Sequence, residues 1–268
     1  MRPLVLLRTV ALVGMLAVLV PATARAGSIS LDTKFQGQFL GIVLNDASYS
    51  FLMGSVSASA ASDLGALDDL DSFEVYCADF FTDAFAPDPG LPLPPATYDA
   101  TASSMTTWTA SNALNTPEAR QRASWLYNEY ADTFATIPAE DEGPSVEREL
   151  AETQRTALQI AIWNVLYDGD LSVATGSTRI TSDANGVTVL AQTYLAALAV
   201  STTVASADAT WLQLTYTNPS GQTIDAQDFI GPIPATTPVP EPSAGLLLGM
   251  GAMSLAAFRS HKTLFRRS

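Results

Sequence analysis

Leu158-Gln159-Ile160-Ala161-Ile162-Trp163 is the stretch around which we interpret the chain, and it lies inside a predicted helix. The helix is expected to run from about Ser145, a residue type that caps helix N-termini, to Tyr167, where an Asp-Gly-Asp sequence ends it. Gln159 and Trp163 are four residues apart and therefore share one face of that helix. The stretch thus predicts a glutamine and a tryptophan presented to the same neighbour.

A second segment, Phe73 to Phe81, is predicted as a strand and contains Cys77, the only cysteine of the chain. Alternate side chains of a strand face the same side, so Cys77 is expected beside Phe73 and Val75 in apolar surroundings. One cysteine cannot form an intramolecular disulfide. In an exported protein it indicates either a special thiol or a small buried hydrophobe, and the residue count leaves both open.

Strand and helix patterns occur along the rest of the body. Alternating apolar and polar residues predict strands over 28–59, with a turn at Asn45-Asp46, and over 96–102, 211–217 and 222–230. Helical spacing predicts one helix from Thr116-Pro117 and another over 187–200. We therefore predict an α+β fold: a β-rich sandwich or barrel-like core with two or three helices packed against it.

Both ends of the chain have the composition of processing signals. Residues 1–26 combine early arginines, an apolar run and Ala24-Arg25-Ala26, as is typical of a secretory signal peptide cleaved before Gly27. A transmembrane anchor is the alternative for this segment, but the apolar run is a little short for one. Residues 27–230 are predicted as the folded domain, 231–239 as a Pro- and Thr-rich linker and 240–268 as a tail.

The charge of the predicted domain excludes some partners. The chain has 13 basic and 27 acidic residues, for a net charge of −14. Between Gly27 and Pro240 the basic residues are one lysine, Lys34, and five arginines. Such an acidic body argues against binding to nucleic acid or to anionic lipid, so contact with a membrane is expected only through the tail.

The tail has three parts: Pro240-Glu241-Pro242, an apolar run over 244–258, and a basic end. This layout resembles the PEP-CTERM sorting signal of Gram-negative bacteria, over about the last 30 residues of the chain. The resemblance implies processing by an exosortase-type protease and a destination at the cell surface, outer membrane or extracellular matrix. An ordinary single-pass anchor is the alternative, and either way the domain lies outside the cytoplasm.

Tyr76-Cys77 and the box Leu158 to Trp163 together resemble the thioester domains of bacterial surface adhesins. The resemblance covers roughly 73–167 and includes an aromatic residue before the cysteine and a hydrophobic-Gln-x-x-hydrophobic-Trp box. It implies an internal thioester between Cys77 and Gln159 and covalent adhesion to a partner that offers an amine or a hydroxyl. The side chains expected to shield that bond from water are Tyr76, Phe80, Ile162 and Trp163.

Other functions fit less well. A cysteine hydrolase or transglutaminase needs a base near Cys77, and the only histidine, His261, lies in the tail. We therefore expect no enzyme, no metal site and no cofactor, with Asp79 or Asp83 as candidates to assist proton transfer. The alternative is a non-covalent matrix or carbohydrate-binding protein, with Trp108 or Trp211 stacking on sugars. Acidic residues 63–71 match no calcium-loop spacing and are predicted as a solvated loop.

Overall fold

A computed structural model describes residues 24–44, 47–80, 96–134, 145–182 and 186–233 of the chain. Its strands form one sheet that closes into a ring of six, in the order β1, β2, β3, β8, β6, β4 and back to β1, while β5 extends it from β1 and β7 pairs with β6. The strands are β1 (Arg25–Leu44), β2 (Ala47–Ser62), β3 (Phe73–Cys77), β4 (Ala96–Ser104), β5 (Thr178–Ser182), β6 (Thr210–Thr217), β7 (Thr223–Asp225) and β8 (Phe229–Gly231).

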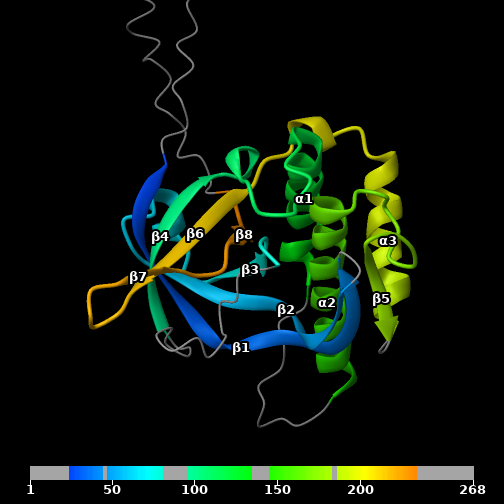
Figure 1. Ribbon diagram of the computed structural model, residues 1–268, viewed down its shortest axis with the longest axis horizontal. Coiled ribbons are helices and arrows are strands. Elements are labelled where there is room, and N and C mark those ends of the chain that lie inside the picture. The colour runs from blue at the N-terminus through cyan, green and yellow to red at the C-terminus, as the bar shows by residue number, and fades with distance from the viewer. Residues whose placement is uncertain (1–23, 45–46, 81–95, 135–144, 183–185, 234–268) are drawn as a thin grey trace, which may run out of the picture.

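Three α-helices lie at one side of the closed sheet: α1 (Pro117–Tyr130), α2 (Val146–Tyr167) and α3 (Val187–Val200) (Figure 1). The side chains of Thr116 and Ser145 accept hydrogen bonds from Ala119 N–H and Arg148 N–H, which satisfies N–H groups that helix starts leave open. Helix α2 packs against β1, β2, α1 and α3. It is buried almost continuously from Ala151 onward because neighbours cover it on every side.

Helix α2 is attached to the β1–β2 hairpin at a point where the backbones of the two strands lie very close together. Gly37 stands opposite Gly54, and a Cβ on Gly37 would lie 1.6 Å from the Met53 carbonyl oxygen, so only glycine fits. The Thr156 Oγ1 of α2 accepts a hydrogen bond from Gln38 N–H at 2.9 Å and lies 2.9 Å from the same Met53 oxygen. The hairpin therefore fixes the position of α2 along the sheet.

The predicted α+β class with a β-rich core is confirmed, and the core is a barrel rather than a sandwich. The three helices begin and end within a residue or two of the expected positions, except that α1 ends at Tyr130. Strand β5 was not predicted, and the expected strand 222–230 is two short strands, β7 and β8. Gly231, placed in the linker by the sequence, belongs to β8, and β3 ends at Cys77 instead of Phe81. The Asn45-Asp46 turn lies outside the described residues.

Candidate functional site

One stripe of side chains on α2 faces the segment 74–80. Its members recur every four residues, the spacing that places side chains on one face of a helix. Arg155 meets Glu74, Gln159 meets Cys77, Trp163 meets Phe80, and Tyr167 meets the backbone of Phe80. A single face of α2 therefore contacts the end of β3 and the residues that follow it.

Gln159 and Cys77 are held together by two hydrogen bonds. Cys77 N–H donates to Gln159 Oε1 at 2.8 Å, and Gln159 Nε2 donates to the Cys77 carbonyl oxygen at 2.8 Å. The β2–β3 ladder ends one residue earlier, at Ser55 opposite Tyr76. The Gln159 carboxamide thus supplies the bonds that a neighbouring strand would give. Both residues are buried, with 1% of Gln159 and 4% of Cys77 exposed.

The Cys77 N–H polarises the carbonyl group of the Gln159 amide. In general, a backbone N–H on a carbonyl oxygen stabilises the negative charge that develops there when a nucleophile adds. Cys77 supplies this N–H and also carries the one thiol of the chain.

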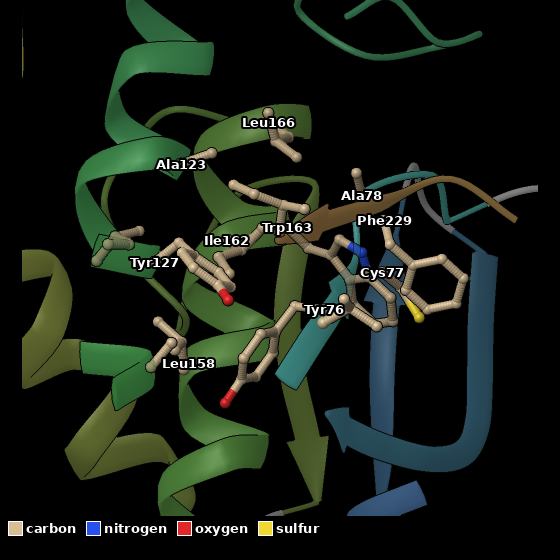
Figure 2. Close-up of a cluster of buried hydrophobic side chains, with 14 of the residues drawn as sticks. Tyr76, Cys77, Ala78, Ala123, Tyr127, Leu158, Ile162, Trp163, Leu166 and Phe229 are labelled. Carbon is tan, nitrogen blue, oxygen red and sulfur yellow. The ribbon is translucent and has the colours of Figure 1, made fainter. Parts of the chain in front are cut away.

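The Cys77 side chain lies on the opposite side of β3 from the Tyr76 ring. Figure 2 shows the sulfur on the side of Phe229, the residue paired with Cys77 in β8, and Tyr76 directed towards Leu158 and Tyr127. The Trp163 ring lies edge-on to the Phe80 ring at 4.8 Å, and Phe80 in turn lies 4.9 Å from the Tyr49 ring. Aromatic side chains therefore cover one flank of the site.

The predicted shielding residues have different surroundings. Phe80 and Trp163 form the aromatic contact beside the site, and Ile162 is fully buried in α2. Tyr76 is also fully buried, but its hydroxyl donates to Glu74 Oε2 at 3.2 Å, away from the sulfur. Burial and the Glu74 carboxylate together raise the pKa of Tyr76 well above its usual value. That these four side chains shield the site stays a prediction.

Glu74 and Arg155 form a buried ion pair next to the site. Arg155 is paired through both Nε and Nη2, with Nε 2.9 and 3.1 Å from the two carboxylate oxygens. Only 3% of the Arg155 side chain is exposed, against 22% of Glu74. Arg155 Nη1 also donates to the Ala151 carbonyl at 3.2 Å. The pair joins β3 to α2 one helical turn before Gln159.

An acidic group lies directly beyond Cys77. The carbonyl oxygen of Asp228 accepts from Ala78 N–H at 2.8 Å and from Asp79 N–H at 3.4 Å. The Tyr167 hydroxyl is 3.3 Å from Asp79 Oδ1 and 3.0 Å from the Phe80 N–H. Burial, with the Asp79 charge next, raises the pKa of Asp228 to about 7. The indoles of Trp211 and Trp108 oppose that rise.

Asp228→Asn is expected to stabilise the protein at pH 8 and to leave it unchanged at pH 4. The folded pKa of Asp228, about 7, lies above the ordinary aspartate pKa of 3.8, so ionisation costs folding free energy. The unfolding free energy of the wild type should therefore fall by about 1–3 kcal/mol as pH rises from about 4 to above 7. The variant should not show this loss, because asparagine does not ionise. Urea unfolding at both pH values measures the difference; an equal effect at pH 4 and pH 8 would assign it to packing instead.

Several predicted positions lie outside the described residues: Asp83, Pro240, Glu241, Pro242 and residues 1–23 of the predicted signal peptide. Arg25 and Ala26, at the predicted cleavage site, are the first residues of β1. Among the residues that are described, no group of histidine, cysteine or acidic side chains is placed to hold a metal ion. In the predicted acidic loop, Asp68 instead accepts from Leu64 N–H and Gly65 N–H, at 3.0 and 2.9 Å.

Sequence reasoning missed Glu74, Arg155, Tyr167 and Asp228. Arg155 and Tyr167 had a usable signal, because each is a multiple of four residues from Gln159. Asp228 had none: it reaches the site only because β8 pairs with β3.

Residues 238–262 match the PEP-CTERM protein-sorting motif. This protein is therefore exported and sorted to the surface of a Gram-negative cell through an exosortase, as the tail predicted. No curated protein and no solved structure matches the chain. Within the part of the chain that the structure describes, no helix is long and apolar enough to span a membrane.

Proposed function

We propose that Cys77 and Gln159 form an internal thioester and that the protein uses it to capture a nucleophile on a partner covalently. The observation that carries the proposal is the two-way hydrogen bonding between the Gln159 carboxamide and the backbone of Cys77. The N–H on the Gln159 carbonyl oxygen comes from the residue that carries the one thiol of the chain, and this supports the proposal.

The bond forms when the Cys77 sulfur adds to the Gln159 carbonyl carbon and ammonia leaves. A partner's amine then attacks the same carbon, forms an amide with Gln159 and releases Cys77 as a thiol. Each molecule reacts once, so the protein is an adhesin and not an enzyme. Cys77 and Gln159 are almost fully buried, and we infer that the partner approaches along the half-buried Asp79 and Phe80.

Intact mass spectrometry of the purified full chain tests the bond. We expect the wild type to be lighter than its sequence by one ammonia, and methylamine to add its own mass to that species. Cys77→Ala should have the full sequence mass and take up no methylamine. A wild-type chain of full mass, whose Cys77 is alkylated quantitatively after unfolding, would rule the thioester out.

In the variant Trp163→Leu, the thioester is expected to be hydrolysed about tenfold faster, because loss of the aromatic contact with Phe80 admits water to the bond. Loss of the ammonia-deficient mass species with time measures this rate. Trp125→Leu is the matched control: Trp125 is similarly buried, but its indole donates to Thr203 at 3.0 Å and its ring contacts Tyr130 on the far side of α1. Equal rates in the two variants would remove Trp163 from the shield.

The target is a surface or matrix component that offers an amine or a hydroxyl, which agrees with surface sorting by the tail. The alternative, a non-covalent carbohydrate-binding or structural matrix protein, has no specific observation in its favour. Trp108, one of the two tryptophans considered for sugar stacking, is fully buried, and Trp211 is half-buried.

A further inference from the structure

Asp79 and Asp228 lie just beyond the Cys77 end of β3, and the charge of Asp79 acts on the Asp228 carboxyl. Phe229, the residue after Asp228, is the register partner of Cys77, and the Asp228 carbonyl holds the N–H groups of Ala78 and Asp79. Asp79 is further fixed by Gln227, whose Nε2 donates to its carbonyl oxygen at 2.8 Å. Asp79 and Asp228 are therefore held by the same backbone contacts that end β3.

Two buried indole N–H groups border the Asp228 carboxyl. Trp108 is fully buried, and neither its Nε1 nor that of Trp211 makes a well-aligned hydrogen bond to any described residue. Both indoles nevertheless lie close enough to Asp228 to favour its ionised form. A buried N–H without a hydrogen-bond partner costs free energy. The two indole N–H groups therefore favour a negatively charged acceptor, and the charge on the Asp228 carboxyl changes the electrostatics of the site.

We propose that Asp228 is a positioning residue that acts through Asp79: while Asp228 holds a proton, Asp79 carries the proton that moves between the Cys77 sulfur and the leaving or attacking nitrogen. In thioester formation, Asp79 takes the thiol proton, the thiolate attacks the Gln159 carbon, and the same proton leaves with the amide nitrogen as ammonia. In capture, Asp79 takes a proton from the attacking amine and returns it to the Cys77 sulfur. No oxidant, reductant or further reactant is needed.

The charge on Asp228 sets the pH range of this exchange. The ionisable groups around it are Asp79 after β3, Asp225 in β7 and Tyr167 in α2. When Asp228 ionises, a second negative charge joins Asp79 and opposes both the thiolate and the anionic oxygen formed during attack. Burial raises the pKa of Asp228 to about 7, so this change falls at neutral pH. The inference rests on the proposed thioester.

Methylamine uptake by the full chain between pH 5.5 and 8.5 tests the inference. The variant Asp228→Asn imitates the protonated acid. Dividing the methylamine uptake rate of Asp228→Asn by the wild-type rate at the same pH removes the effect of methylamine ionisation. We expect this ratio to be near one at pH 5.5 and to rise severalfold at pH 8.5. Asp225→Asn, which removes an acid with a smaller effect on the Asp228 carboxyl than Asp79 has, should keep the ratio flat. Asp79→Asn should slow uptake at every pH.

The wild type alone supplies a second measurement that needs no variant. Its rate, divided by the fraction of methylamine present as the free base, should fall as pH rises through neutrality. A constant corrected rate, or the same flat ratio for Asp228→Asn and Asp225→Asn, would overturn the role of Asp228 and leave the thioester standing. A wild-type chain that is not one ammonia short in mass would overturn both.

Discussion

Arg155→Met should destabilise the protein by about 3–5 kcal/mol, because it leaves the Glu74 carboxylate unpaired at a largely buried position. Arg155 contacts both oxygens of Glu74 and is itself 3% exposed. The Tyr76 hydroxyl also donates to that carboxylate but carries no charge that could replace Arg155. The substituted methionine keeps much of the apolar stem but none of the charge. Urea unfolding at pH 7 measures the loss.

The matched control is Arg148→Met on the same helix. Arg148 pairs with Glu152 at 3.8 Å, and both side chains are more exposed than Arg155. Ion pairs between residues four apart on one helix contribute about 0.3–0.5 kcal/mol. Adding Glu74→Gln to Arg155→Met should recover part of the loss by removing the unpaired charge. A cost below that of Arg148→Met would mean that the Glu74–Arg155 contact does not hold β3 to α2.

Gln159→Ala should cost about 2–4 kcal/mol in a background of Cys77→Ala, where no thioester can form. The buried backbone N–H and carbonyl at position 77 would then both lose the hydrogen bonds that Gln159 makes to them, at a point where the β2–β3 ladder has already ended. Each unsatisfied buried backbone group costs about 1–3 kcal/mol. Chemical denaturation of the single and double variants measures this structural contribution apart from the covalent chemistry.

Gln154→Ala in the same background is the control, because Gln154 lies on the same helix but outside the stripe that faces β3. A change within about 0.5 kcal/mol is expected there. If Gln159→Ala is as mild as Gln154→Ala, the amide does not hold the end of β3. The proximity on which the thioester depends would then lose its structural basis.

The helices, and the placement of Gln159 and Trp163 on one helix face, were predictable because their signals are local. Thr116 and Ser145 are capping residues that predict the starts of two helices. The four-residue spacing of Gln159 and Trp163 places both on one face of α2. Alternation along β3 places Cys77 and Tyr76 on opposite sides of the strand. The pattern does not place Phe80, because β3 stops three residues before it.

By itself, the sequence determined the sorting signal, the three helices, and one cysteine in a body that contains no histidine. Only the tertiary structure decided that the sheet closes into a barrel, that Glu74 pairs with Arg155, and that Asp228 lies beside Asp79. The physical reason is that each of these depends on contacts between residues far apart in the chain. Closure, for example, requires the three-residue strand β8 to pair with both β3 and β6, and so short a segment has no periodicity of its own to reveal it.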